Sequence, residues 1–122
     1  EHLAERRRKS SPLRHVAGMV RSFSYAALTG LGAATQNRPE DYERLAPWAE
    51  LWERWVTAAF LRAYLTAAAG APFVPSRRDD FDLLLHTFIL DKAIYELAYE
   101  LNNRPDWAGI PIEGIRQLVG TP

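Results

Sequence analysis

The sequence predicts a single all-α domain, and three observations support this fold class. Apolar residues recur at helical spacing along most of the chain, and no stretch alternates apolar and polar residues as a half-buried strand would. Prolines, glycines and asparagines gather in short segments between these stretches, where they end helices. The 122 residues, 48% of them hydrophobic, are enough to form one helical core.

The composition also excludes several classes of function. Fifteen basic and fifteen acidic residues give a formal charge of zero, so neither nucleic acid nor a membrane is an expected partner. The absence of cysteine excludes disulfides and thiolate sites and fits a cytoplasmic location. His2, His15 and His86 are too scattered for a zinc site, so no metal is expected in this chain. No apolar run reaches the roughly 18 residues needed to span a bilayer.

The N-terminal residues 1–14 are rich in basic side chains. They contain five basic residues and two acidic ones: Arg6, Arg7, Arg8, Lys9, Arg14, Glu1 and Glu5. This run is either a solvated terminus or a segment that faces an anion and whose other half lies upstream. Because the chain starts without an initiator methionine, we expect residues 1–122 to be one helical module, a fragment of a longer enzyme.

The first helix is expected from Pro12 to about Leu28. Ser11 is a suitable N-cap, and Pro12 occupies the first helical position, where its missing N–H costs no hydrogen bond. Glycines and polar residues within 30–39 are expected to end this helix. Apolar residues at helical spacing define its buried face: Val16, Met19, Val20, Phe23 and Ala27.

A second helical region is expected from Pro39 or Glu40 to about Ala69. Pro47 is expected to kink or divide it, because proline removes a hydrogen bond and clashes with the preceding turn. The region carries a broad apolar stripe that we interpret as core. Its members include three of the four tryptophans of the chain: Trp48, Leu51, Trp52, Trp55, Ala59, Phe60, Ala63, Tyr64 and Ala67.

A third helix is expected from about Arg77 to Asn102, and it has two apolar lines. One line is Leu83, Leu90, Ile94, Leu97 and Leu101, and the other is Phe81, Leu84, Leu85 and Phe88. We therefore expect this helix to be central and buried on two sides. Residues 106–111 are expected to form an extended loop that carries Trp107, and a last helix is expected from about Pro111 to Leu118.

The C-terminal half of the third helix is more polar than a core helix should be. Lys92, Glu96, Tyr99 and Asn103 share one face, with Tyr95 and Glu100 at its edges. One interpretation is a solvated face stabilised by the pairs Lys92–Glu96 and Glu100–Arg104. The other is a sugar site, because carboxylates, asparagine and arginine bind hydroxyls and tyrosine offers a flat surface to a pyranose.

Three segments carry a resemblance to a known family. The strings SPLRHVAGMVRSFSYAA (residues 11–27), WERWVTAAFLRAYL (52–65) and FILDKAIYELAYELNNRPDWAGIPIEGI (88–115) resemble the C-terminal part of bacterial maltokinases. The same module ends the trehalose synthase–maltokinase fusions. The string YELNNRPDW followed by IP is long and specific, and the resemblance covers nearly the whole chain.

The resemblance implies a fold and an activity. It implies the helical C-terminal half of the C-lobe of a kinase-like, aminoglycoside phosphotransferase-like fold. The parent enzyme would transfer the γ-phosphoryl group of ATP to maltose, giving maltose 1-phosphate in trehalose and α-glucan metabolism. In that family the catalytic and magnesium-binding aspartates precede this segment. This chain alone is therefore expected to be inactive and to bind no cofactor, with ATP and Mg²⁺ implied for the parent.

The resemblance also implies site residues and partners. Those expected to contact or orient maltose or a related sugar are Glu96, Tyr99, Glu100, Asn103 and Arg104. His15 stands where the family usually has an aspartate, and a neutral imidazole replaces a carboxylate poorly as an acceptor. The alternative function is a non-catalytic interaction module, which is either a degenerate kinase remnant or the surface by which the kinase meets a trehalose synthase partner. In either case the uncovered apolar surface of such a module predicts a homodimer.

Overall fold

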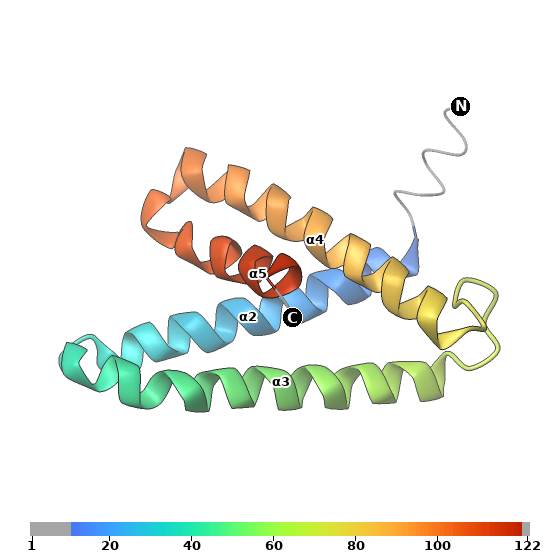
Figure 1. Cartoon of the computed structure of the whole chain (residues 1–122), viewed down its shortest axis with the longest axis horizontal. Helices are drawn as coiled ribbons and strands as arrows, with labels where there is room; N and C mark the ends of the chain where they lie inside the picture. Colours follow the sequence, from blue (N-terminus) through green and yellow to red (C-terminus); the bar gives the residue numbers. More distant parts are fainter. Residues whose placement is uncertain (1–10, 121–122) are drawn as a thin grey trace. The chain divides into compact units, whose positions relative to one another are not determined.

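The computed structural model describes residues 11–120, and every regular element within them is helical (Figure 1). The basic run at residues 6–9 lies outside this range. The elements are α2 (Pro12–Thr35), the short 3₁₀ helix η1 (Pro39–Asp41), α3 (Tyr42–Ala67), α4 (Arg78–Asn103), a second 3₁₀ helix η2 (Pro105–Trp107) and α5 (Gly109–Val119). The predicted all-α class is confirmed for these residues.

The described chain forms two compact units. Unit 1 contains residues 11–21 and 68–120, and therefore the start of α2 together with α4, η2 and α5. Unit 2 contains residues 22–67, which are the rest of α2, η1 and α3. Each unit is described by itself below.

In unit 2, α2 is longer than the sequence predicted. The helix continues past Leu28 and through Gly30 and Gly32 to Thr35. Leu31 and Thr35 are buried, and the Thr35 hydroxyl donates a 2.8 Å hydrogen bond to the Leu31 carbonyl oxygen. Packing of this last turn offsets the roughly 1 kcal/mol that each glycine costs in a helix. The predicted end at Leu28 was wrong for this reason.

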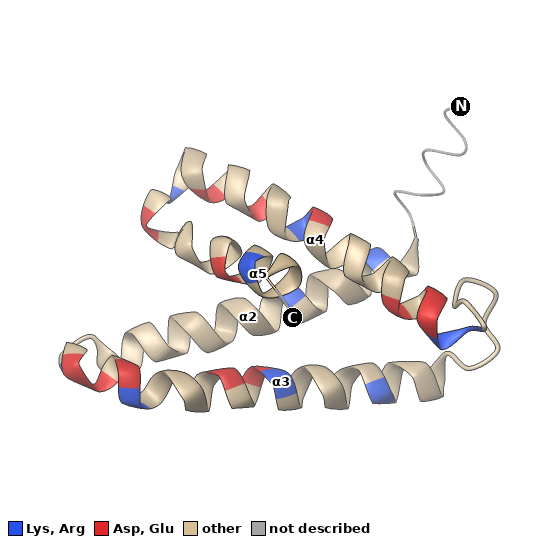
Figure 2. Ribbon diagram, in the orientation of Figure 1, with Lys and Arg blue, Asp and Glu red and all other residues tan. Residues whose placement is uncertain are grey.

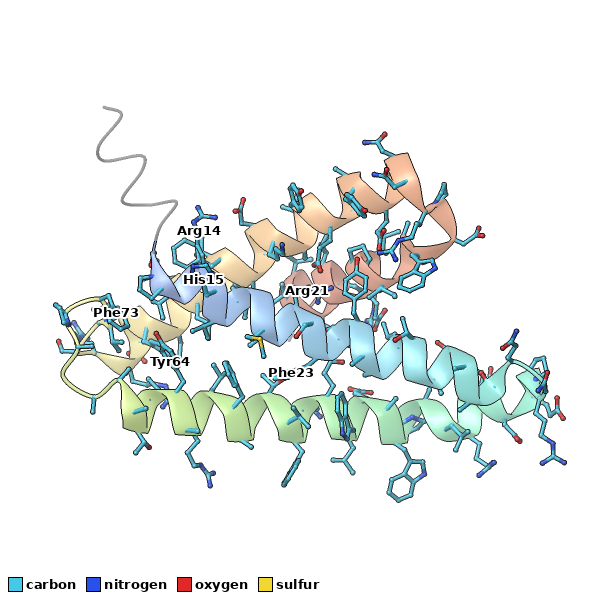
Figure 3. The ribbon with its side chains drawn as sticks, turned by 180° about the vertical axis from the view of Figure 1, so that it is seen from behind. Arg14, His15, Arg21, Phe23, Tyr64 and Phe73 are labelled. Carbon is cyan, nitrogen blue, oxygen red and sulfur yellow. The ribbon has the colours of Figure 1, made fainter. Side chains whose placement is uncertain are left out.

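Aromatic side chains join α2 and α3 within unit 2. Phe23 and Phe60 meet edge to face with their ring centroids 5.6 Å apart, and Tyr64 stacks on Phe60 at 6.5 Å. The buried Ser24 hydroxyl donates a hydrogen bond to the Glu53 carboxylate. Figure 3 shows Phe23 on the side of α2 that faces α3. These contacts define the face of α3 that packs against α2.

The tryptophans of α3 lie on a different face, so the prediction that they form core was wrong. Trp48, Trp52 and Trp55 are 67%, 44% and 70% exposed. Helical periodicity places Trp48 and Trp55 well away from Phe60, whose face already packs against α2, and places Trp52 between the two faces. Pro47 does not divide α3, which runs through it as one 26-residue helix. Pro47 and Glu43 are exposed, so water can bond the carbonyl of Glu43 that the proline leaves without a donor.

In unit 1, the buried side of α4 packs against α2 and α5. Apolar residues of this core include Leu13, Val16, Ala17, Phe81, Leu85, Ala93 and Ala108. The prediction that α4 is buried on two sides was wrong in part. Leu83, Ile94 and Leu101 are more than half exposed, because no described element of unit 1 covers their side of the helix.

Residues 105–107 and 109–111 are helical rather than extended, with a turn at Ala108 between them. Pro105 begins η2, and the Trp107 and Ala108 N–H groups donate to the carbonyl oxygens of Arg104 and Pro105 at 2.8 and 3.1 Å. Proline fixes φ near the helical value, which explains why it starts a 3₁₀ turn here. The predicted extended loop was wrong, and α5 starts two residues earlier than expected, at Gly109.

Candidate functional site

A buried ion pair fixes the middle of α4 in unit 1. Arg21 Nε donates a 2.6 Å hydrogen bond to Glu96 Oε1, and the two side chains are 3% and 11% exposed. Arg21 also lies against Gly114 of α5, where a Cβ atom would collide with its guanidinium group. The carboxylate of Glu96 therefore points into the protein and joins α2 to α4. The Lys92–Glu96 surface pair that one interpretation of the sequence invoked is replaced by this buried pair.

A second carboxylate organises the C-terminal end of α4. Glu100 is fully buried and accepts two 2.9 Å hydrogen bonds from Arg104, from Nε and Nη2. The Arg104 guanidinium carbon lies 3.9 Å from the ring centroid of Trp107 and 5.9 Å from that of Tyr99. A bidentate, stacked guanidinium has little freedom to rotate. The first turn after α4 is held in place by this arrangement.

The other predicted site residues lie at the surface. Tyr99 is 47% exposed, and Asn103 is exposed with its Nδ2 donating a 2.9 Å hydrogen bond to the Tyr99 carbonyl oxygen. The structure thus brings together Tyr99, Asn103 and Arg104 around the end of α4. Glu96 and Glu100 lie behind them in the interior, where their carboxylates are engaged by arginines.

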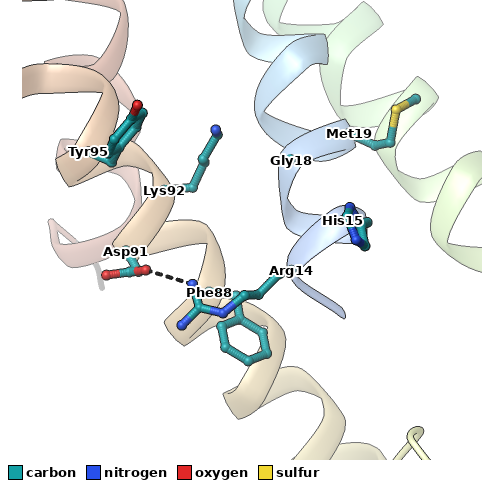
Figure 4. A pocket seen from close by; sticks show the side chains of 8 residues that line it. All are labelled: Arg14, His15, Gly18, Met19, Phe88, Asp91, Lys92 and Tyr95. Carbon is teal, nitrogen blue, oxygen red and sulfur yellow. Dashed lines mark hydrogen bonds and ion pairs between the residues drawn. The ribbon is translucent and has the colours of Figure 1, made fainter. Parts of the chain in front are cut away.

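A pocket of about 540 Å³ lies between the first turns of α2 and the middle of α4, both in unit 1 (Figure 4). Arg14 reaches across it and forms a 3.0 Å ion pair with Asp91, while its guanidinium carbon lies 4.7 Å from the centroid of the Phe88 ring. The Lys92 ammonium lies 5.1 Å from the centroid of the Tyr95 ring. The pocket is lined by Arg14, His15, Gly18, Met19, Phe88, Asp91, Lys92 and Tyr95.

The pocket and the end of α4 are linked by one line of side chains. Five residues at helical spacings of four, three, four and four form this line, which we name the α4 stripe: Phe88, Lys92, Tyr95, Tyr99 and Asn103. Tyr95 and Tyr99 are 63% and 47% exposed. Figure 2 shows that both basic and acidic residues lie along the same helix. The stripe therefore offers aromatic faces between hydrogen-bonding groups.

The sequence indicated part of this site. Lys92, Glu96, Tyr99 and Asn103 were predicted to share one face, with Tyr95 and Glu100 at its edges. In the structure Lys92, Tyr95, Tyr99 and Asn103 follow one line of α4, whereas the Glu96 carboxylate turns inward to Arg21. Phe88 and Arg14 were missed, because Phe88 was counted with the core and Arg14 with the N-terminal basic run. The four-residue spacing from Phe88 to Lys92 was the signal that could have extended the line.

The chemistry of the α4 stripe suits a neutral, hydroxyl-rich ligand. Tyrosine rings pack against apolar sugar faces, while lysine, asparagine and the tyrosine hydroxyls exchange hydrogen bonds with the rim of a sugar. In residues 11–120 no three carboxylate or histidine side chains gather closely enough to hold a metal ion.

No family model matches this chain. Among the helices of the described segment, none combines the length and the apolar character that crossing a membrane requires.

Proposed function

We propose that this chain is the helical, substrate-side part of an ATP-dependent maltokinase, and that the α4 stripe binds maltose. The observation that carries this proposal is the exposed pair Tyr95 and Tyr99, one helical turn apart and continuous with a pocket of about 540 Å³. That volume is within the range of sites for small ligands. The resemblance of residues 88–115 to maltokinases names the sugar.

The geometry of the α4 stripe suits a disaccharide better than a single sugar ring. Side chains four residues apart are offset by about 6 Å along a helix, which is comparable with the offset between the two rings of maltose. One ring would stack on Tyr95 beside Lys92 and the other on Tyr99 beside Asn103. Glu100 acts as a positioning residue in this arrangement, because it fixes Arg104 against Trp107 and thereby the turn next to Asn103.

The proposed reaction assigns binding and orientation to this chain. The bond between the γ-phosphorus of ATP and its bridging oxygen breaks, a bond to the anomeric oxygen of maltose forms, and the hydroxyl proton passes to a base. ATP, Mg²⁺ and that base belong to the part of the kinase lobe outside these residues, so we expect this chain alone to lack turnover. The exposed apolar line Leu83, Ile94 and Leu101 suits a face covered by that part of the lobe.

Binding of maltose to the purified chain tests the proposal. Titration with maltose, followed by backbone amide NMR, should shift resonances of residues 88–103 while glycerol at the same concentration should not. Tyr95→Ala and Tyr99→Ala should each weaken binding at least tenfold. Leu83→Ala, at a position on another side of α4 that is 68% exposed, is the control and should leave binding unchanged. Shifts scattered over the whole chain, or none, would contradict the proposal.

A non-catalytic interaction module is the second candidate function, with trehalose synthase as its partner. The exposed tryptophans of α3 are the observation that favours it, because large apolar side chains grouped at a surface mark interaction sites. Co-purification of this chain with a trehalose synthase, lost on substitution of those tryptophans, would support this candidate. Maltose binding at the α4 stripe without such co-purification would favour the first.

A further inference from the structure

The outward face of α3 in unit 2 has the spacing of a coiled-coil seam. Six residues follow one another at intervals of four, three, four, three and four, and all six are exposed: Arg44, Trp48, Leu51, Trp55, Ala58 and Arg62. Regular alternation of three and four residues keeps one narrow line of a helix facing a partner helix. We name this line the α3 seam. Its centre is apolar, and an arginine lies at each end.

The α3 seam leaves enough apolar surface in water to form an interface. Trp48, Leu51 and Trp55 are 67%, 57% and 70% exposed, and Trp52, which flanks the seam, is 44% exposed. These side chains leave roughly 450 Å² exposed, given about 200 Å² for a tryptophan. Two such patches and the arginine stems beside them would bury on the order of 1,000 Å², the lower bound of a specific interface.

Charge along α3 is distributed so that its two ends attract each other. The segment from Pro39 to Glu50 carries four acidic residues and one basic residue, namely Glu40, Asp41, Glu43, Glu50 and Arg44. After Glu53, up to Ala67, the charged residues are Arg54 and Arg62 alone. Figure 2 shows this change from red to blue along the helix. Two copies that run antiparallel bring the basic end of one beside the acidic end of the other, whereas parallel copies place like charges together.

We propose that the α3 seam is a self-association surface, through which two copies of this chain pair with their α3 helices antiparallel. The contact is isologous, with its two-fold axis beside Leu51 and Trp52, so that the tryptophans of one copy pack against those of the other. The modest area predicts a dimer with a dissociation constant in the micromolar range. This inference is independent of maltose binding, which involves unit 1.

Molar mass in solution tests the surface. Sedimentation equilibrium of the full chain between about 1 and 100 μM should show a monomer–dimer equilibrium. Tryptophan emission should shift to the blue as the concentration rises. The double variant Trp48→Gln/Trp55→Gln should raise the dissociation constant at least tenfold. Leu83→Gln/Ile94→Gln, two comparably exposed apolar residues of α4, is the matched control and should leave it unchanged.

Single cysteines test the orientation, because the chain has none of its own. Leu51 lies next to the proposed axis, so the variant Leu51→Cys should form a disulfide-linked dimer under mild oxidation. Thr66→Cys, on the same face near the end of α3, should not, since two antiparallel copies place these positions about 40 Å apart. A monomer at 100 μM would overturn the proposal. So would association lost in the α4 control but kept in the tryptophan variant, or cross-linking through position 66 in place of position 51.

Discussion

Gly114 of α5 and Arg21 of α2 are in direct contact: the hydrogen of the glycine is the largest group that fits beside the guanidinium of the arginine. Arg21 cannot retreat from a larger side chain without disturbing its 2.6 Å hydrogen bond to Glu96. The close approach of α5 to the start of α2 in unit 1 therefore depends on one small residue.

Gly114→Ala should lower the free energy of unfolding by about 1–3 kcal/mol, the usual range for overpacking a core. Gly30→Ala is the matched control. Gly30 lies within α2, away from its ends, and a Cβ atom added there would meet no atom within 4 Å. Alanine there should raise stability by about 0.5–1 kcal/mol. Urea unfolding followed by circular dichroism measures both variants. Equal effects of the two substitutions would show that Arg21 yields to the added methyl group.

The pair formed by Arg21 and Glu96 should be the most sensitive polar contact of unit 1. Glu96→Leu or Arg21→Met should each lower the free energy of unfolding by about 3–5 kcal/mol, because either leaves an uncompensated buried charge. The double variant Arg21→Met/Glu96→Leu should recover much of that loss, since an apolar pair carries no charge into the interior.

The exposed pair Arg78–Asp82, with a separation of 3.0 Å, is the control for this cycle. Asp82→Asn should change stability by less than about 0.5 kcal/mol, because solvent screens the pair. Chemical unfolding of the unmodified chain, the two single variants and the double variant at Arg21 and Glu96 gives the coupling energy of the pair. Single variants at Arg21 and Glu96 that are no more harmful than Asp82→Asn would mean that water reaches the pair.

The phenol of Tyr64 should make the stability of the protein depend on pH in the alkaline range. Burial raises the pKa of its phenol above 10.0, because the charged form would lose its hydration. The folded protein therefore favours the neutral phenol. The stability that Tyr64 contributes in this form is complete below pH 10 and is lost as the pH rises from 10 through the pKa of Tyr64 in the folded protein. Phenol absorbance at 295 nm during a pH titration should show one tyrosine that ionises late, and Tyr64→Phe should remove it.

The same substitution has a second expected effect at neutral pH. The Tyr64 hydroxyl is buried and has no hydrogen-bond partner among residues 11–120. Removing a polar group in that position should raise stability by about 1 kcal/mol, while the ring contact with Phe60 is kept. Thermal unfolding of Tyr64→Phe at pH 7 is the measurement, and a lower melting temperature would contradict it.

The sequence predicts where helices begin and end better than it predicts which face of each helix is buried. The start of α2 at Pro12 and the end of α4 near Asn103 follow from local chemistry, an N-terminal proline and a proline after the helix, and both were predicted to within a residue. The extension of α2 to Thr35 depends on the burial of Leu31, which is a tertiary effect that no local pattern of glycines reports.

The exposure of Trp48 and Trp55 could not be predicted for a related reason. Apolar residues occupy more than one face of α3, and only the contact of Phe23 with Phe60 decides which face turns inward. In the same way, spacing alone placed Glu96 beside Lys92 and Tyr99. The partner that turns the Glu96 carboxylate inward, Arg21, is 75 residues away in the chain. Helical periodicity gives no information about partners that are so far apart in the chain.

Trp107 and Tyr99 allow stability and sugar binding to be separated at the end of α4. Trp107 stacks on the Arg104 guanidinium, so Trp107→Ala should lower the free energy of unfolding by about 1–2 kcal/mol through the lost cation–π contact and ring burial. Tyr99 is 47% exposed and 5.9 Å from the same guanidinium, so Tyr99→Ala should cost less than about 1 kcal/mol.

Under the proposed function, Tyr99 matters more than Trp107 for maltose binding. Tyr99→Ala should weaken binding at least tenfold, whereas Trp107→Phe, which keeps a ring under Arg104, should leave binding near that of the unmodified chain. Parallel thermal unfolding and NMR titrations of the three variants measure both quantities. Loss of maltose binding in strict proportion to loss of stability would assign this end of α4 a structural role alone.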